Sequence, residues 1–486
     1  MRLDQVISRA PAGARDVEVR DLAYEDRAVK PGSLFFCVPG LTRDGHDFAA
    51  AAVSRGAVAL VLQRPLNLGV PEIVVESVRE EMARAAAAFN GDPTAALQVV
   101  GVTGTNGKTT TAFLVRALLE GAGHRCALLG TVKSVIGGVE HPVVRTTAEA
   151  IELQHDFRAM LDAGDEACAM EVSSHALALH RTDAIHYAAA IFTNLSRDHL
   201  DFHPTMEAYF DAKRRLFAAE PEPGVAIVNV DDPYGARLAA ELRSPVTFAL
   251  ERNASFRALR VEASLNGTRF ELQTPDGAIG LRSPLRGRFN VYNVLGALAA
   301  ARALGVELQS AAATLRNAGH VPGRLEPVEE GQGFAVLVDY AHTPDSLQNV
   351  LLTARALTGA RVHVVFGCGG DRDRGKRALM GEIAARLADG VIVTSDNPRS
   401  EDPEAIIREI LAGAAGAGGE EVAWLVDRRA AIEQAIAQAG PGDVVLIAGK
   451  GHEQGQEHAD GHKVPFDDVT VAREALRGTP VPGWQR

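Results

Sequence analysis

A glycine-rich turn that is followed by a lysine and threonines gives the clearest chemical signal in this sequence. The apolar segment Val99 to Thr103 leads into Gly104-Thr105-Asn106-Gly107-Lys108-Thr109-Thr110, and a helical pattern with Leu114 and Leu118 on one face comes next. Backbone amides of such a turn bind phosphate, the lysine reaches the terminal phosphates, and the first threonine hydroxyl binds Mg²⁺. Val102 stands where the longer GxxxxGK[ST] pattern has glycine, so the shorter TGTNGKT form remains. The sequence therefore predicts a binding site for the magnesium complex of a nucleoside triphosphate.

Further candidates for metal binding and catalysis follow other apolar segments. Glu171 lies at the end of one such segment and offers the first carboxylate at the expected edge of the sheet. His199 follows another segment, and Lys213 lies in a predicted helix over residues 206–217. Taken alone, a surface histidine and a solvated lysine are the more common roles. Ser173-Ser174-His175 could suggest a serine hydrolase, but no GxSxG motif surrounds it, so this interpretation is disfavoured.

Short β-branched segments alternate with Ala- and Leu-rich stretches of helical length, which is typical of βαβ units and predicts an α/β fold with parallel sheets. Ligands of such sheets bind beyond the carboxyl ends of the strands, and most of the strand candidates run into polar or glycine-rich segments. The strand candidates are Val99 to Thr103, Ala167 to Val172, Ala188 to Thr193, Val225 to Val230, Phe334 to Val338, Val362 to Phe366, Val391 to Thr394 and Val444 to Ile447.

Length and composition limit the class of protein. At about 150 residues per domain, 486 residues predict about three domains. The net charge of −12 and an aromatic content of 5% make nucleic acid and an anionic membrane surface poor partners. No apolar stretch is long enough to span a membrane, so we expect a cytoplasmic protein. The four cysteines lie far apart without metal-site spacing, and we expect reduced, buried residues.

Two places in the chain are predicted to separate domains. The first is near Gln98, before the strand that leads into the glycine-rich turn, and the second is the polar turn at 331–333. We therefore expect domains at 1–98, 99–331 and 332–486. A third stretch, Gly413 to Gly419, is predicted to be a small-residue linker between a helix and a strand.

Taken together, the motifs resemble those of the Mur ligase family over essentially the whole chain. The order and spacing of these motifs are far more specific than any single one. They are TGTNGKTT (103–110), MEVSSHALALHR (170–181), FTNLSRDHLDFH (192–203), AKRRLF (212–217), FNVYN (289–293), GR (323–324), DYAHTPD (339–345), FGCGGDRDRGKR (366–377), DNPR (396–399) and AGKGHE (448–453).

The resemblance implies an N-terminal α/β domain for the uridine part of the substrate, a central P-loop ATPase domain and a C-terminal Rossmann-like domain for an amino acid. The implied reaction joins an amino acid to UDP-N-acetylmuramoyl-L-alanyl-D-glutamate through an acyl phosphate, with ATP converted to ADP and phosphate, in cytoplasmic peptidoglycan precursor synthesis. The DNPR form of the pocket motif resembles that of enzymes that take meso-diaminopimelate. Alternatives are the L-lysine-adding ligase, the D-Ala-D-Ala-adding ligase, a folylpolyglutamate synthetase and, from another class, a P-loop ATPase that acts as a switch or motor.

The resemblance also implies a role for individual residues. Lys108, Glu171, His199 and Lys213 are the expected catalytic residues. ATP contacts are expected from Gly104, Thr105, Asn106, Gly107, Lys108, Thr109, Thr110, Asn293, Arg324 and Asp339. Two Mg²⁺ ions are expected, one at Thr109 and Glu171 and one at His199 and Lys213, the latter carboxylated by CO₂. Contacts to the UDP-dipeptide are expected from Asp26, Thr146, Thr147, Ser173 and Arg181, and contacts to diaminopimelate from Arg372, Asp396, Asn397, Pro398, Arg399, Gly449 and Glu453. A monomer is expected.

The chain departs from the family pattern in two places. Glu25-Asp26-Arg27 replaces the family's DSR triplet, which places a carboxylate where a hydroxyl is expected. Leu179 precedes His180 and Arg181, where some members have a glutamine. Both departures fall on expected contacts to the UDP-dipeptide.

Overall fold

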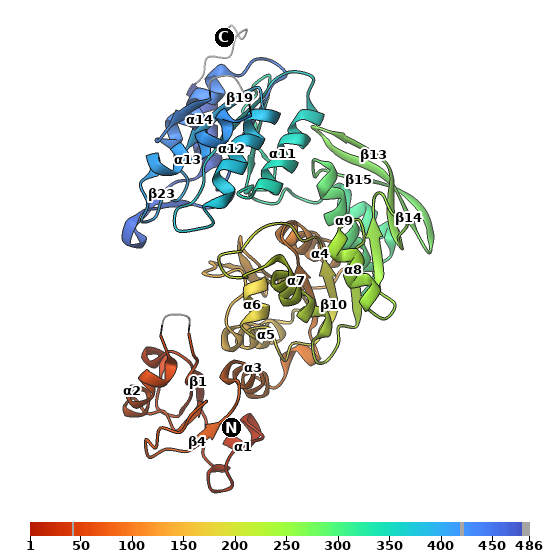
Figure 1. Cartoon of the computed structure of the whole chain (residues 1–486). Helices are drawn as coiled ribbons and strands as arrows, with labels where there is room; N and C mark the ends of the chain where they lie inside the picture. Colours follow the sequence, from red (N-terminus) through yellow and green to blue (C-terminus); the bar gives the residue numbers. More distant parts are fainter. Residues whose placement is uncertain (41–42, 418–421, 479–486) are drawn as a thin grey trace.

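Three separate sheets organise the chain into three α/β parts, which follow one another from bottom to top in Figure 1. The structure is a computed structural model, and it describes residues 1–40, 43–417 and 422–478. We call the parts N-terminal (Leu3 to Ala95), middle (Gln98 to Arg316) and C-terminal (Glu326 to Gly478) after the elements they contain. An α/β fold with parallel sheets is thus confirmed.

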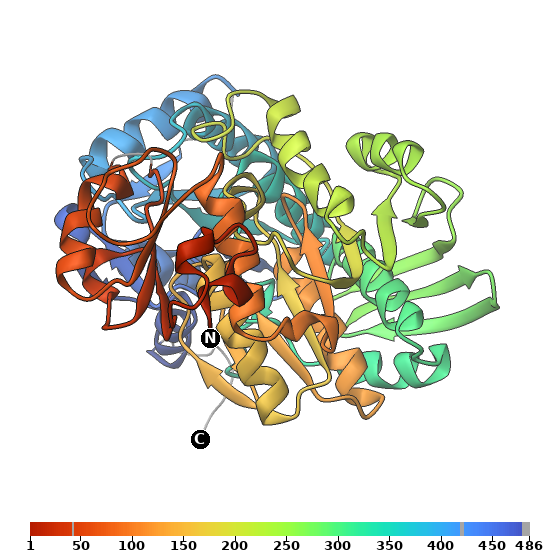
Figure 2. The same cartoon turned by 90° about the horizontal axis from the view of Figure 1, so that it is seen from below.

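The N-terminal part has a four-stranded parallel sheet in the order β1-β2-β3-β4. Helix α3 packs against α5 of the middle part, and Figure 2 shows the N-terminal part from below. The elements are α1 (Leu3–Val6), β1 (Asp21–Ala23), β2 (Ser33–Phe36), α2 (Ala49–Ser54), β3 (Ala59–Leu62), β4 (Glu72–Val74) and α3 (Val78–Phe89), with short 3₁₀ turns that include Asp26–Ala28.

The middle part is built on a sheet in the order β15-β14-β13-β12-β11-β10-β5-β9-β6-β7-β8. Strand β5 lies between β9 and β10, both parallel to it, so three carboxyl ends meet at one edge. The elements are β5 (Gln98–Thr103), α4 (Lys108–Gly121), β6 (Cys126–Leu129), β7 (Ser134–Ile136), β8 (Val139–His141), α5 (Ala150–Ala163), β9 (Ala167–Glu171), α6 (Ser174–Ala178), β10 (Tyr187–Phe192), α7 (Met206–Arg214), β11 (Val225–Asn229), α8 (Pro233–Glu241), β12 (Val246–Ala249), β13 (Phe256–Ser264), β14 (Gly267–Thr274), β15 (Gly277–Ser283), α9 (Arg288–Ala303) and α10 (Leu308–Arg316).

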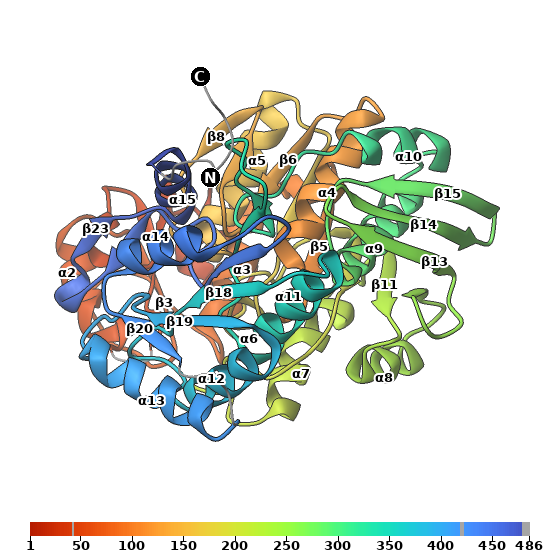
Figure 3. The ribbon, with the colours of Figure 1, turned by 90° about the horizontal axis from the view of Figure 1, so that it is seen from above.

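Helices cover both faces of this sheet, because its parallel strands are apolar on both sides. Helices α4, α9 and α10 pack on one face, and α5, α6, α7 and α8 pack on the other. The antiparallel strands β13, β14 and β15 extend beyond α9, as Figure 3 shows from above. Functional side chains are therefore expected at the carboxyl edge of the sheet, where neither helix layer covers the strand ends.

The C-terminal part has a sheet in the order β16-β17-β21-β18-β19-β20, in which only β16 is antiparallel to its neighbour. Helices α11, α12 and α13 cover one face, and α14 and α15 cover the other. The elements are β16 (Glu326–Pro327), β17 (Ala335–Asp339), α11 (Pro344–Leu357), β18 (Val362–Phe366), α12 (Gly375–Leu387), β19 (Gly390–Thr394), α13 (Pro403–Ala415), β20 (Ala423–Leu425), α14 (Arg428–Gln438), β21 (Val444–Ala448), β22 (Gly455–Glu457), β23 (Lys463–Pro465) and α15 (Asp468–Gly478).

All eight predicted strands are present, as β5, β9, β10, β11, β17, β18, β19 and β21, with bounds that differ by at most one residue at each end. The four cysteines are free and buried, as predicted. Among the described residues, no helix is both long and apolar enough to cross a membrane.

The predicted linker at Gly413 to Gly419 is wrong for its first residues, because α13 extends to Ala415, whereas Gly416 and Ala417 follow the helix as predicted. Gly413 lies inside α13, and a Cβ atom at this position would lie 1.9 Å from the carbonyl oxygen of Ala378 on α12. A Cβ atom at Gly381 of α12 would likewise lie 2.0 Å from the carbonyl oxygen of Ile410. These glycines let two helices approach closely, so they serve packing. Residues 418 and 419 lie outside the described residues.

A buried ion pair joins the first residues of α14 and α15. The guanidinium of Arg428 donates to both carboxylate oxygens of Asp468, at 2.8 and 2.7 Å, and both side chains are fully buried. We expect Asp468→Ala to lower the free energy of unfolding of the C-terminal part by about 3–5 kcal/mol, because it leaves a buried charge without its partner. Urea unfolding followed by circular dichroism measures this change.

The same two helices offer a matched control. Arg429 and Glu474 form an exposed pair at 2.7 Å, and Glu474→Ala should cost less than about 1 kcal/mol. Equal losses in the two variants would contradict the role given to the buried pair.

Candidate active site

The P-loop connects β5 to α4 at the middle of the sheet edge. Gly104 and Gly107 have φ angles of +152° and +86°, which favour glycine, and added Cβ atoms would lie 1.9 Å from Thr193 Oγ1 and 2.2 Å from Asn293 Oδ1. Lys108 Nζ donates to the carbonyl oxygens of Gly104 and Thr105, both at 2.9 Å. The lysine therefore folds back over the loop, and burial lowers its pKa. Phosphate oxygens could replace these carbonyls as its partners.

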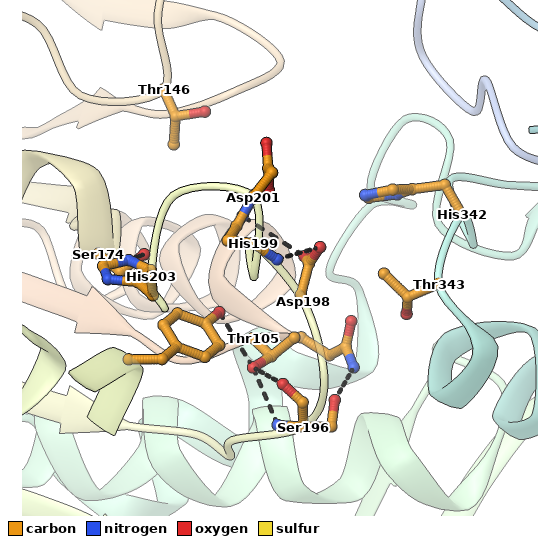
Figure 4. Close-up of polar contacts among 12 residues, drawn as sticks. Thr105, Thr146, Ser174, Ser196, Asp198, His199, Asp201, His203, His342 and Thr343 are labelled. Atoms are coloured by element: carbon orange, nitrogen blue, oxygen red, sulfur yellow. Dashed lines mark hydrogen bonds and ion pairs between the residues drawn. The ribbon is translucent and has the colours of Figure 1, made fainter. Parts of the chain in front are cut away.

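Residues that follow β10 hold the P-loop in place. Thr193 Oγ1 donates to the carbonyl oxygen of Asn106 at 2.6 Å, and the amide of Asn106 donates to Asn194 Oδ1 at 2.9 Å. The hydroxyl of Thr105 accepts a hydrogen bond from the amide of Ser196 at 3.0 Å. Figure 4 shows this contact between Thr105 and Ser196, and the Thr105 hydroxyl also lies 3.2 Å from the hydroxyl of Tyr209. The loop is thus fixed before any ligand binds.

The carboxylate of Glu171 at the end of β9 lies beside the first threonine of α4. Thr109 Oγ1 donates to Glu171 Oε2 at 3.1 Å, and Thr131 donates to the same carboxylate through its amide at 2.7 Å and its hydroxyl at 3.0 Å. Arg324, in the segment that leads into the C-terminal part, donates to Thr109 Oγ1 at 3.0 Å. A hydroxyl and an oriented carboxylate are hard oxygen donors, which suits Mg²⁺.

A cluster of aromatic and histidine rings surrounds His199. Its ring lies 4.8 Å from that of His175, centroid to centroid, and Asp198 Oδ2 lies 3.4 Å from its Nε2. Burial lowers the pKa of His199 well below its usual range, so the imidazole is neutral and can act as a metal ligand. His203 Nε2 shares a hydrogen bond with the Ser174 hydroxyl at 2.9 Å, and Figure 4 shows these two side chains together. The ring of His203 also stacks on that of Tyr209.

Lys213 lies on α7, fully buried beneath the P-loop. Its Nζ donates to the carbonyl oxygen of Gly104 at 2.8 Å and lies 4.6 Å from the centre of the Tyr209 ring. Burial, together with the neighbouring Lys108 ammonium, holds the pKa of Lys213 well below its usual range. Lys213 therefore lies close to the P-loop, in surroundings that favour the neutral form of its amine.

The residues predicted to bind the UDP-dipeptide fall into two groups. Thr147 Oγ1 donates to the carbonyl oxygen of Glu171 at 2.8 Å, and Arg181 donates to the carbonyl oxygen of Thr147 at 3.2 Å. These residues line the cavity together with Thr146 and Ser173. Asp26, by contrast, does not line it, and its carboxylate pairs with Arg55, which directly follows α2 in the N-terminal part.

The residues predicted to bind the amino acid converge on loops that follow β18, β19 and β21. Asn397 Nδ2 donates to Glu453 Oε2 at 2.8 Å, and Lys450, which is fully buried, donates to Asn397 Oδ1 at 2.8 Å and to Glu453 at 3.0 Å. Arg372 lies 3.9 Å from the carboxylate of Asp201 across the gap to the middle part. Polar side chains from three strand ends therefore form one wall.

The residues predicted to contact adenosine have protein partners of their own. Asp339 accepts hydrogen bonds from the amides of Leu325 and Ala341, both at 2.8 Å, and burial raises its pKa to about 6. Arg324 lies over the Tyr340 ring at 4.7 Å. Asn293 of α9 accepts a hydrogen bond from the Thr111 hydroxyl at 3.4 Å.

Residues from all three groups line one cavity of about 1100 Å³ between the middle and C-terminal parts. In Figure 4, His342 of the C-terminal part lies across this space from Asp198. Pro398 and Gly104 are near but do not line the cavity. The predicted residues that do line it are Thr105, Asn106, Gly107, Lys108, Thr109, Thr110, Thr146, Thr147, Glu171, Ser173, Arg181, His199, Lys213, Asn293, Arg324, Asp339, Arg372, Asp396, Asn397, Arg399, Gly449 and Glu453.

Several residues of the site were not predicted from the sequence. Asn194, Thr131 and Tyr209 fix the P-loop and Glu171, and Arg145 and Lys376 add positive charge to the cavity wall. A signal existed for Asn194, because it directly follows a predicted strand. Thr131 and Tyr209 gave no such signal, since their roles depend on which strands and helices become neighbours.

The site combines a P-loop, hard oxygen donors and a polar pocket between α/β parts, which defines a nucleotide-dependent enzyme with a second substrate. Family models match residues 19–94 (Mur ligase family, catalytic domain), 102–301 (Mur ligase middle domain) and 323–451 (Mur ligase, glutamate ligase domain). The chain belongs to the Mur ligase family.

Relatives of known name match nearly the whole chain. The UDP-N-acetylmuramoyl-L-alanyl-D-glutamate–2,6-diaminopimelate ligase of Geobacillus thermodenitrificans is 47% identical over 98% of this chain and 99% of its own. The ligase of the same name from Streptomyces coelicolor is 46% identical over 98% and 96%. A solved structure of a ligase with this name has a TM-score of 0.71 and 34% identity, and the match covers 98% of this chain and 99% of the other.

The position of Lys108 leads to a direct test of the P-loop. We expect Lys108→Ala to lower turnover of ATP by at least about 10²-fold, because it removes the charge that faces the developing negative charge on the phosphates. The melting temperature should change little, since the side chain is only half-buried. Release of ADP in the presence of all substrates measures the effect.

Lys133→Ala provides the control, because Lys133 pairs with Glu140 and does not line the cavity. Wild-type turnover in the purified Lys108→Ala protein would contradict the assignment of the P-loop.

Proposed function

We propose that this enzyme joins meso-diaminopimelate to UDP-N-acetylmuramoyl-L-alanyl-D-glutamate, with ATP converted to ADP and phosphate. The observation on which the proposal depends is the single cavity in which the P-loop, Glu171 and an arginine-rich pocket face one another. Relatives that are 43–48% identical over most of the chain have the name of this activity, which supports the same assignment here.

The chemistry explains why a P-loop and an amino-acid pocket must share one cavity. A carboxylate is a poor electrophile, so an oxygen of the D-glutamyl γ-carboxylate first attacks the γ-phosphorus of ATP, and ADP leaves. The amine of diaminopimelate then attacks the carbonyl carbon of the acyl phosphate, loses a proton and expels phosphate. Anionic groups crowd this centre, and Lys108 is placed to neutralise the charge on the phosphates.

Two Mg²⁺ ions fit the donors that the cavity offers. Thr109 and Glu171 would hold the ion of the nucleotide, and neutral His199 with a modified Lys213 would hold a second one. Bound Mg²⁺ would supply positive charge that stabilises the negative charge on the transferring phosphoryl group. The hydrogen bonds that Thr131 donates to Glu171 orient this carboxylate for the role.

Carboxylation of Lys213 is consistent with its surroundings. A neutral amine attacks CO₂ to form a carbamate with loss of one proton, and burial of Lys213 lowers the pKa of its amine, which favours the neutral form. The product replaces a potential cation beside Lys108 with an anion. This change turns repulsion between two lysines into attraction, and it creates an oxygen ligand for a metal ion.

The Arg399 guanidinium supports diaminopimelate as the amino acid. The two candidate substrates differ by one carboxylate at the far end, which a guanidinium can hold through two parallel hydrogen bonds. L-Lysine offers no such carboxylate. Discrimination would therefore combine attraction of one substrate with rejection of the other.

Further parts of the proposal concern the setting of the reaction. We propose that the enzyme acts as a cytoplasmic monomer in peptidoglycan precursor synthesis, and so in cell-wall growth, cell shape and division, without nucleic acid or membrane partners. We place the domain boundaries at 98 and 331. The uridine would lie near the N-terminal part, where Asp26 and Arg55 already form an ion pair.

If Lys213 is carboxylated, a small acid should restore activity to a variant that lacks its side chain. Lys213→Ala should lose most of its activity, and added formate or acetate should restore part of it, because a small acid can occupy the position of the carbamate. Lys213→Arg should not be rescued, since it leaves a permanent cation there. Initial rates with and without short carboxylates measure both effects, and an intact mass equal to that of unmodified lysine in the active, CO₂-saturated protein would refute the modification.

The choice of amino acid gives the second test. We expect meso-diaminopimelate to be incorporated about 30-fold to several thousand-fold better than L-lysine, because an unpaired charged group in the pocket costs about 2–5 kcal/mol. Arg399→Ala should lose most of this preference. An incorporation assay with the UDP-dipeptide, ATP and each amino acid measures it.

The same assay separates the alternatives. Equal use of both amino acids by the wild-type protein would refute the assignment to diaminopimelate, and a preference for L-lysine would favour the lysine-adding ligase. A P-loop switch or motor would hydrolyse ATP without the UDP-dipeptide and the amino acid, whereas the ligase needs both.

A further inference from the structure

A short hairpin lies directly behind the wall of the cavity that contains Arg399. It is formed by β22 and β23, and Gln456 and Glu457 bind the loop that follows β19. Gln456 Nε2 donates to the Ser395 hydroxyl at 2.7 Å, and the amide of Glu457 donates to Asn397 Oδ1 at 2.9 Å. The hairpin and the loop are therefore joined by side-chain contacts on both sides of the pocket residue Asp396.

Arg399 is held by this hairpin in a conformation that arginine rarely adopts. Its φ angle is +51°, in the left-handed region, and its amide donates to the carbonyl oxygen of Glu457 at 3.1 Å. A β-bridge to His458 lies beside this contact. A strained residue persists only where its surroundings enforce it, and here the enforcing contacts come from the hairpin.

The guanidinium of Arg399 has protein partners at two of its three nitrogens, Nε and Nη1. Its Nε donates to Glu457 Oε2 at 3.0 Å, and its Nη1 donates to the carbonyl oxygen of Gly370 at 2.8 Å. Its Nη2 has no hydrogen-bond partner in the part of the chain that the structure describes. Nη1 and Nη2 each keep an N–H group, and together these can bind a carboxylate in parallel.

Glu457 itself is not part of the cavity wall. Arg399, Asn397 and Glu453 line the cavity, whereas Glu457 does not. Its carboxylate contacts Arg399 from the Nε side, and its amide contacts Asn397 from behind. Glu457 therefore touches two pocket residues at once without lying where the amino acid would bind.

We propose that Glu457 is a positioning residue that orients Arg399 toward the terminal carboxylate of the incoming amino acid. This inference deepens the proposed function and rests on it. An arginine side chain has several rotatable bonds, and the pair with Glu457 selects one orientation before the substrate arrives, so less freedom is lost on binding. Glu457 thus determines specificity indirectly, through the residue in front of it.

Steady-state kinetics of the full-length protein test the proposal. We expect Glu457→Ala to raise KM for meso-diaminopimelate by about tenfold, with kcat and the KM values for ATP and the UDP-dipeptide nearly unchanged. Glu457→Gln keeps an oxygen that can accept from Nε, so its KM should lie between those of the wild type and Glu457→Ala. Use of L-lysine should not worsen in either variant, because L-lysine lacks the carboxylate that Arg399 would hold.

Glu474→Gln is the matched control, because Glu474 forms an exposed pair with Arg429 away from the cavity. An unchanged or lowered KM for meso-diaminopimelate in Glu457→Ala would overturn the proposal. A lower melting temperature of this variant, together with a kcat that falls equally with every amino acid tested, would overturn it as well, because it would indicate a general loss of structure. A wild-type protein that does not incorporate meso-diaminopimelate would overturn the proposed function and this inference with it. An active wild type with unaffected variants would overturn the inference alone.

Discussion

The carbonyl oxygen of Gly104 accepts hydrogen bonds from two lysines, Lys108 at 2.9 Å and Lys213 at 2.8 Å. The rest of the site depends on this close approach of two amino groups to one carbonyl oxygen. Two ammonium groups so close together inside a protein repel each other strongly, so one of them must lose its charge or gain an anion. The structure meets this constraint through the lowered pKa of Lys213. The same constraint makes the site attractive to phosphate.

The order of the strands in the middle sheet brings Lys108 and Lys213 to the same carbonyl oxygen. Strand β5 supplies the P-loop, β9 supplies Glu171, and β10 leads to Thr193 and Asn194, so the three neighbouring carboxyl ends surround the phosphate-binding turn. Helix α7 then returns across this edge and places Lys213 beneath the loop. Because each strand end is fixed by the hydrogen bonds of the sheet, small side chains such as Thr193 are sufficient to hold the loop.

The C-terminal part reaches the P-loop through polar side chains. Asp345 accepts hydrogen bonds from Asn106 Nδ2 at 2.8 Å and from the Ser196 hydroxyl at 3.1 Å, and Arg324, in the segment that leads into this part, reaches Thr109. An apolar contact joins the two parts as well, because Phe289 of α9 packs against the hydrophobic cluster of the C-terminal part. Ligands that enter the cavity would compete with the hydrogen bonds that Asp345 and Arg324 make.

Buried charged side chains hold the residues that line the amino-acid pocket in place. Lys450 and Arg428 are fully buried, and they hold Asn397, Glu453 and the ends of β19 and β21 from behind. A buried ammonium that donates to two pocket residues fixes their orientation, because an unpaired charge in that position would be costly. Specificity in this pocket would thus depend both on the side chains that line it and on the buried side chains that orient them.

Hydrophobic periodicity and strand-end motifs such as GTNGKTT are local signals, so the α/β class and eight strands could be predicted from the sequence. The motifs, through their resemblance to those of the Mur ligase family, also indicated many of the residues that line the cavity. Which of these residues come into contact depends on the tertiary structure. Lys213 lies 109 positions from Gly104 in the chain, and their contact depends on the order of strands in the sheet. Likewise, Gly413 resembled a linker residue until the close packing of α12 on α13 explained it, and the structure shows that Asp26 lies apart from the cavity and pairs with Arg55. Contacts between distant residues depend on strand order and helix packing, and no local pattern in the sequence contains them.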